Sequence, residues 1–70
     1  MITREADGLV RVTGTAAIYC GMWVKCKARS NHICKLSGKT IIPGDEIYRP
    51  ITNSVQRGHR VHAAKMEFYL

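Results

Sequence analysis

Short β-rich segments separated by turn-forming residues fill most of this chain, and only its last nine residues are rich in helix formers. Turn pairs such as Ser37-Gly38 and Pro43-Gly44 prevent any longer run of one element. With 70 residues, the chain is long enough for one domain only. The sequence therefore predicts a β-rich α+β fold, a small twisted antiparallel sheet of four or five strands with one short C-terminal helix.

The expected domain covers residues 8–70, preceded by a flexible N-terminal arm at residues 1–7, which show no clear periodicity. Alternating apolar and polar residues predict strands at 9–13, 22–29, 46–51 and 59–61. The polar residues 52–58 are expected to form a hairpin loop, and residues 62–70 the helix.

Residues 22–29 divide into two sets, because side chains alternate between the faces of a strand. The apolar set is predicted to face the core: Met22, Val24, Cys26 and Ala28. The second set combines cations with one aromatic ring: Trp23, Lys25, Lys27 and Arg29. Proteins that bind single-stranded nucleic acid use this combination, since cations bind phosphates and a ring stacks on a base. The alternative is that Trp23 belongs to the core and the lysines are merely solvated.

The charge distribution favours a polyanionic partner. Eleven Lys and Arg residues face five Asp and Glu residues, and no acid occurs between Gly8 and Gly44 or between Ile47 and Met66. A positive field of this kind attracts nucleic acid and speeds its association. We expect nucleic acid or another polyanion to bind the Trp23 face, with Lys39, Arg57 and Arg60 adding phosphate contacts. The alternative is a solvated surface that keeps a small protein soluble.

The sequence lacks the usual motifs of an enzyme. It has no glycine-rich phosphate loop and no Gly-x-Ser-x-Gly motif, and its adjacent acids Asp45 and Glu46 would point to different faces of a strand. Cys34 with His62 is the best candidate for a nucleophile and its base, but a chain this short leaves little room for a substrate cleft. A non-enzymatic binding module is therefore expected.

The location expected from the sequence is the cytoplasm. The first seven residues contain no apolar segment typical of a secretory signal, and no apolar run is long enough for a membrane helix. The three cysteines are an odd number, which fits a reducing compartment. No membrane partner is expected.

From Cys34 onward the sequence resembles a treble-clef zinc finger. In that family a Cys-x-x-Cys knuckle precedes a hairpin, and two further ligands lie at the start of a terminal helix; here the corresponding segments are Cys34-Lys-Leu-Ser37 and His62-Ala-Ala-Lys65. Serine and lysine are poor ligands for structural zinc. We therefore expect no metal cofactor. The alternative is a zinc site made by Cys34 and His62 with His59 or Cys26.

The motif Cys-x-Leu-Ser-Gly-x-x-Ile-x-x-Gly-Asp-x-Ile-Tyr-x-Pro is also similar to that of a group of small uncharacterised bacterial and phage proteins. This resemblance implies a metal-free clef-like fold and carries no activity with it. In such a fold Cys34 would pack as a small buried hydrophobe. Ser37 and Gly38 would then close the turn by local hydrogen bonds.

A protein partner is the second functional hypothesis. The chain ends in the apolar residues Phe68, Tyr69 and Leu70, and its sheet is expected to have an edge strand. These features predict a homodimer, or a complex with a host protein if the gene belongs to a phage or prophage. In that case the basic surface would serve solubility only.

Overall fold

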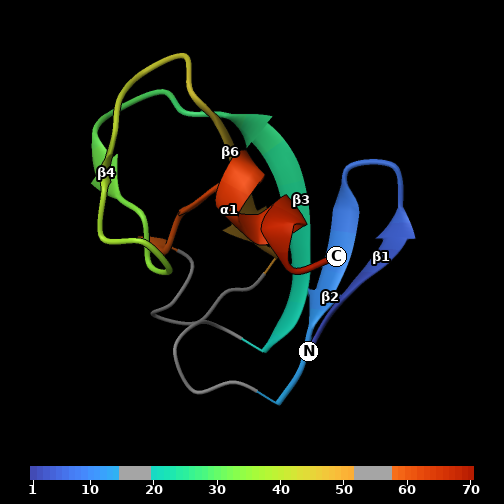
Figure 1. The fold of residues 1–70 in the computed structure, drawn as a ribbon. Helices are drawn as coiled ribbons and strands as arrows, with labels where there is room; N and C mark the ends of the chain where they lie inside the picture. The colour runs from blue at the N-terminus through green and yellow to red at the C-terminus, as the bar shows by residue number, and fades with distance from the viewer. Residues whose placement is uncertain (15–19, 52–57) are drawn as a thin grey trace.

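The computed structural model describes residues 1–14, 20–51 and 58–70. Within them, one antiparallel sheet has the strand order β1-β2-β3-β6-β7, and β4 and β5 form a separate hairpin (Figure 1). The strands are β1 (Ile2–Ala6), β2 (Leu9–Val12), β3 (Gly21–Lys27), β4 (His32–Ile33), β5 (Thr40–Ile41), β6 (Glu46–Pro50) and β7 (Val61–His62). The helix α1 (Ala63–Phe68) follows β7 directly. The predicted fold class is confirmed.

Residues 1–7 do not form the predicted arm. Residues 2–6 are strand β1, which pairs antiparallel with β2 in a register that places Ile2 opposite Val12. Gly8, with a φ of 75°, provides the tight turn between the two strands. All side chains of β1 except Ile2 are exposed. Edge pairing of this kind depends on backbone hydrogen bonds and leaves no hydrophobic pattern in the sequence.

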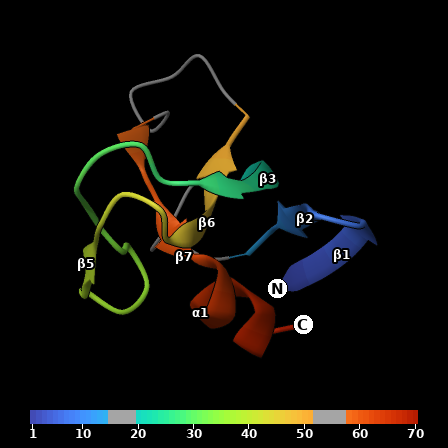
Figure 2. The same ribbon diagram turned by 90° about the horizontal axis from the view of Figure 1, so that it is seen from above.

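One face of the sheet is covered by α1 (Figure 2). The register places Val10, Trp23, Tyr48 and Val61 on this face, and all four side chains are buried. The helix buries Ala63 and Met66. Glu67 of α1 accepts hydrogen bonds from Tyr48 Oη at 3.1 Å and from Lys25 Nζ at 3.2 Å, which joins the helix to β6 and β3. We call this the helix face and its opposite the open face.

The prediction for residues 22–29 grouped alternate side chains correctly, but it assigned the wrong faces within β3 up to Cys26. Ala28, just beyond β3, is buried as predicted, and Lys27 and Arg29 are exposed as predicted. Trp23 is fully buried on the helix face, so the alternative that placed it in the core is confirmed. Met22, Val24 and Cys26, predicted to be core, are half-buried on the open face. A tryptophan ring buries roughly 150–250 Å², so the helix packs on the side of the sheet that carries the ring.

Lys25 lies on the same face of β3 as Trp23, so it too is next to the helix. Its ammonium lies beneath the helix, 3.2 Å from Glu67 and 3.3 Å from Glu46. Hydrogen bonds to these two carboxylates raise the pKa of Lys25 above its ordinary value, and they neutralise its charge locally. Lys25 therefore links the helix to the sheet, and its two carboxylate partners would compete with an external anion.

Candidate nucleic-acid interface

A pocket of about 570 Å³ lies beside the end of β3, and basic side chains surround it. Four of its lining residues are Lys or Arg, and none of the described lining residues is acidic. The lining, which we call the basic pocket, consists of Cys26, Lys27, Ala28, Arg29, Ser30, His32, Ile47, Arg49 and Arg60. None of the described lining side chains would therefore repel an anion bound in this pocket.

The sheet register explains how side chains from separate segments meet there. Cys26 of β3 pairs with Ile47 of β6, and the next open-face position on β6 is Arg49. Just beyond β3, the backbone NH of Ala28 donates to the carbonyl of Asp45 at 2.8 Å. The chain then bends and brings Arg29 to the pocket. The pocket therefore rests on hydrogen-bonded backbone.

Arg60 joins the pocket from the segment that precedes β7. An isolated parallel bridge links it to Cys34, and its carbonyl accepts from the NH of Lys35 at 2.9 Å. Its own guanidinium donates to the carbonyl of His59 at 2.8 Å, which restricts the side chain. Arg60 thus presents a positioned charge from the far end of the chain.

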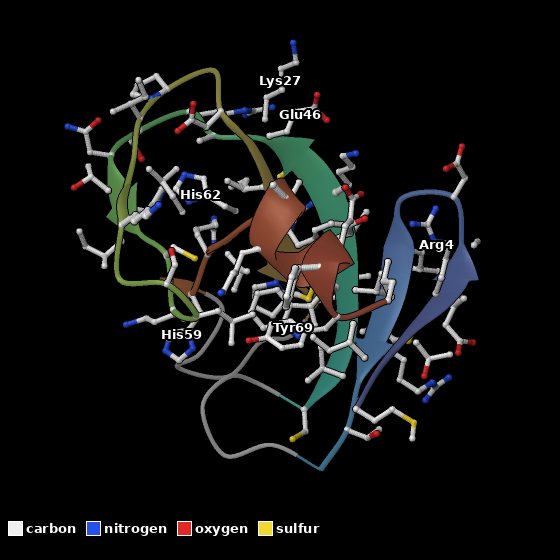
Figure 3. All side chains as sticks on the ribbon, viewed as in Figure 1. Arg4, Lys27, Glu46, His59, His62 and Tyr69 are labelled. Carbon is white, nitrogen blue, oxygen red and sulfur yellow. The ribbon has the colours of Figure 1, made fainter. Side chains whose placement is uncertain are left out.

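The other three cations, Lys27, Arg29 and Arg49, are exposed. Figure 3 shows Lys27 projecting from the end of β3, far from Arg4 on β1. Ser30 Oγ and His32 Nε2 lie 3.1 Å apart and add two polar groups to the lining. Arginine guanidinium groups match phosphate oxygens in a two-point fashion, so this set suits a phosphate group.

Three of the seven residues predicted to bind nucleic acid line this pocket: Lys27, Arg29 and Arg60. Trp23 is fully buried, so the prediction that its ring stacks on a base is wrong. Lys25 is paired with Glu46 and Glu67 on the helix face, and its contact with phosphate stays a prediction. Lys39 lines a different pocket, beside α1 with Lys65 and Phe68. Arg57 lies outside the described residues. Sequence reasoning missed Arg49, although its alternation with Ile47 in the predicted strand would have placed the two on one face.

Acidic side chains gather on the other side of the sheet. A second pocket, of about 550 Å³, is lined by three of the chain's five acids, Asp45, Glu46 and Glu67, together with Lys25 and His62. Three of the five acids therefore lie around this second pocket, together with Lys25, whereas none lies among the described lining residues of the basic pocket.

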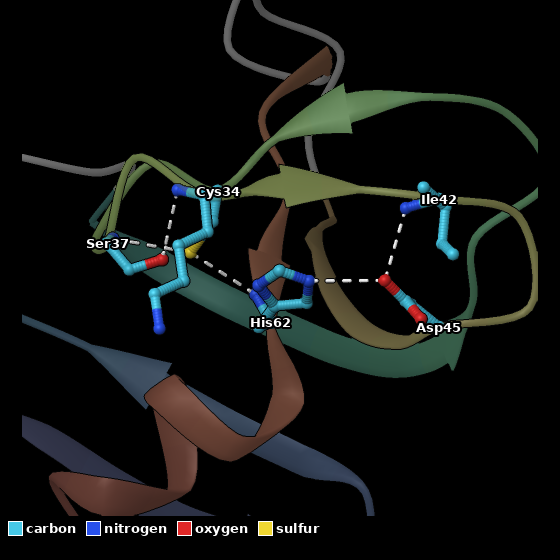
Figure 4. Close-up of polar contacts among 6 residues, drawn as sticks. Cys34, Ser37, Ile42, Asp45 and His62 are labelled. Atoms are coloured by element: carbon cyan, nitrogen blue, oxygen red, sulfur yellow. Dashed lines mark hydrogen bonds and ion pairs between the residues drawn. The ribbon is translucent and has the colours of Figure 1, made fainter.

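The turn after β4 is closed by hydrogen bonds around Cys34 (Figure 4). The thiol sulfur accepts from the backbone NH groups of Ser37 and His62, each at 3.4 Å, and the carbonyl of Cys34 accepts from Gly38 at 2.8 Å. Cys34 is only 1% exposed. The predictions that Cys34 packs as a small buried residue and that Ser37 and Gly38 close the turn by local hydrogen bonds are confirmed.

The residues of the zinc alternative are not brought together as a ligand set. The ring of His62 points to Asp45, with Nε2 3.3 Å from Oδ2, and Cys26 lines the basic pocket. In residues 1–14, 20–51 and 58–70, no three His, Cys, Asp or Glu side chains are grouped to hold a metal ion. The absence of a cofactor remains a prediction.

Hydrogen bonds also set the ionisation of Cys34. Burial raises its pKa, but hydrogen bonds from Ser37 and from the backbone of His62 outweigh burial and lower the pKa to about 7. The folded pKa thus lies below the ordinary value of 9.0. The thiolate therefore stabilises the fold most above the ordinary value, and this contribution is lost as the pH falls through about 7.

We predict that Cys34→Ala lowers the free energy of unfolding by about 1–3 kcal/mol, because two partly buried NH groups lose their acceptor. The difference from wild type should grow as the pH rises from about 6 to about 8.5. Urea denaturation followed by circular dichroism at both pH values measures it. Cys20→Ala, at an exposed position, is the control. A pH-independent difference would show that the thiolate does not stabilise the fold.

Comparison with protein-family models, with curated proteins and with solved structures finds no match to this chain. The resemblances to treble-clef zinc fingers and to small phage proteins therefore remain predictions from sequence motifs. No helix in the described part of the chain is long and apolar enough to cross a membrane.

Proposed function

We propose that this protein is a non-enzymatic module that binds nucleic acid through the basic pocket. The observation that carries the proposal is the convergence of Lys27, Arg29, Arg49 and Arg60 on one pocket whose described lining holds no acid. Isolated surface lysines would suffice for solubility. Cations from three chain segments around one concavity suit a bound phosphate better.

Binding is through phosphates and not through base stacking. Trp23 is fully buried, and the described lining of the basic pocket contains no Trp, Tyr or Phe. Contacts to phosphate fix position but carry no sequence information. The proposal therefore expects little dependence on base sequence, and it replaces the expected preference for stacked single strands.

The separation of charge supports the same face. Three of the five acids line the pocket on the helix face, where two of them pair with Lys25, whereas the described lining of the basic pocket holds four cations and no acid. The basic pocket faces the other way. Long-range attraction thus orients the molecule before contact, as in other electrostatically steered complexes. A cytoplasmic location, where nucleic acid is present and thiols stay reduced, belongs to this proposal.

The test is the salt dependence of binding, measured by fluorescence anisotropy with a labelled 20-base-pair duplex. If all four cations contact phosphates, the logarithm of the association constant should fall against the logarithm of salt concentration with a slope of about −3.6. A matched single strand should give a slope of about −2.8. Affinity that does not change with salt, or no binding near 50 mM salt, where such complexes are strong, would overturn the proposal.

A protein partner is a second candidate, favoured by the exposed C-terminal residues. Phe68 and Tyr69 are 77% and 50% exposed, and Lys65 Nζ lies 5.5 Å and 5.7 Å from the centroids of their rings. This candidate predicts a dimer that persists at moderate salt and is lost when residues 68–70 are deleted. Sedimentation that shows a monomer at every concentration would remove the dimer.

A further inference from the structure

We infer that the basic pocket binds the phosphorylated end of a nucleic-acid strand, a terminal phosphomonoester, in preference to the internal backbone. This inference rests on the proposed function and names the part of the nucleic acid that the pocket takes. It follows from the shape of the pocket, from the charge of its lining and from the nature of its floor.

The shape favours a chain end. Proteins that bind the internal backbone distribute their cations along a groove that follows the strand. Here the cations converge from the end of β3, the bend after it, β6 and the segment before β7. The volume of about 570 Å³ lies in the range of pockets that hold small ligands, and it could hold a terminal nucleotide.

The charge favours a monoester. A terminal phosphate carries roughly −1.5 to −2 charges at neutral pH and three acceptor oxygens, whereas each internal diester carries only one charge. Arg29 and Arg49 are exposed beside the pocket, and Arg60 is held by its hydrogen bond to His59. Several guanidinium groups around one phosphate bind a monoester more strongly than a diester, because the monoester has the larger charge and one more acceptor oxygen.

The apolar bottom of the pocket favours contact with one sugar and one base, without recognition of which base it is. Ile47 and Ala28 are 1% and 5% exposed, and Cys26 is half-buried, so the bottom of the pocket is apolar. Besides the four cations, Ser30 and His32 supply the polar side chains of the lining. Few groups there could discriminate one base edge from another, so the phosphate dominates recognition.

The experiment compares three single-stranded decamers of one sequence that carry an internal label. One has hydroxyl groups at both ends, one has a 5′-phosphate and one has a 3′-phosphate. We expect at least one phosphorylated decamer to bind on the order of tenfold more tightly than the hydroxyl form. Arg49→Ala should abolish this advantage. Arg4→Ala removes the same charge from the helix face and should leave it intact.

The outcomes separate this inference from the proposed function. Equal affinity for all three decamers would overturn the inference and leave nucleic-acid binding in place. Absence of binding to every decamer would overturn both. Adenosine monophosphate is the competitor that distinguishes the sources of the phosphate. If it displaced the phosphorylated decamer with equal affinity, the pocket would be assigned to free nucleotides and the strand-end inference would be overturned.

Discussion

Replacing Trp23 by alanine should unfold most of this protein or bring it close to unfolding. The ring is fully buried between the sheet and the rest of the core, and truncation of a buried tryptophan costs roughly 3–5 kcal/mol. A domain of 70 residues is expected to have only roughly 4–10 kcal/mol of total stability. Urea denaturation followed by far-ultraviolet circular dichroism would show the loss without relying on tryptophan fluorescence.

Two variants make this result specific to the core. Trp23→Phe keeps an aromatic ring and should retain much of the stability and all of the nucleic-acid binding. Met22→Ala changes the neighbouring, half-buried residue on the open face and should cost less than Trp23→Ala. If Trp23→Ala kept the wild-type urea midpoint but bound single strands weakly, the ring would be a stacking group and the assignment of faces would be incorrect.

The double variant Arg29→Ala with Arg49→Ala should bind nucleic acid roughly 100-fold more weakly at low salt, about tenfold for each lost charge-assisted contact to phosphate. The slope of the salt dependence should become less steep by about 2, since two phosphate contacts are removed. Both side chains are exposed, so the double variant is expected to fold normally. Anisotropy titration with the duplex measures affinity and slope together.

The matched control is the double variant Arg4→Ala with Lys39→Ala. It removes the same formal charge from exposed positions outside the basic pocket. If long-range attraction alone drove binding, both double variants would lose affinity equally. An equal loss would therefore assign binding to net charge and argue against the basic pocket as the site.

The sequence predicted the class of fold and most of the elements in the described residues. Alternation marked β2, β3 and β6, and the helix formers marked α1, because these signals are local. The strand β1 was missed since its exposed side chains carry no apolar period. The short β4–β5 hairpin was missed because two residues in each strand are too few to show a period, although Ile41 is buried in the core.

The candidate site was predicted in part. Lys27, Arg29 and Arg60 were identified from their charge and position, and they do line one pocket. Arg49 was not identified, and the tryptophan at the centre of the expected site proved to be core. The charge of each residue is visible in the sequence. The contact between β6 and the segment before β7, which brings Arg49 and Arg60 together, depends on long-range strand pairing.

The sequence by itself determined which side chains of each strand share a face, because alternation is a property of extended backbone. It also determined the positive charge and its distribution along the chain. Only the tertiary structure decided which face is covered. The helix packs where it can bury Trp23 and bind Lys25 through Glu67, and the opposite face is thereby left to Arg49 and the basic pocket. That choice depends on the contact between α1 and the sheet, which no local pattern encodes.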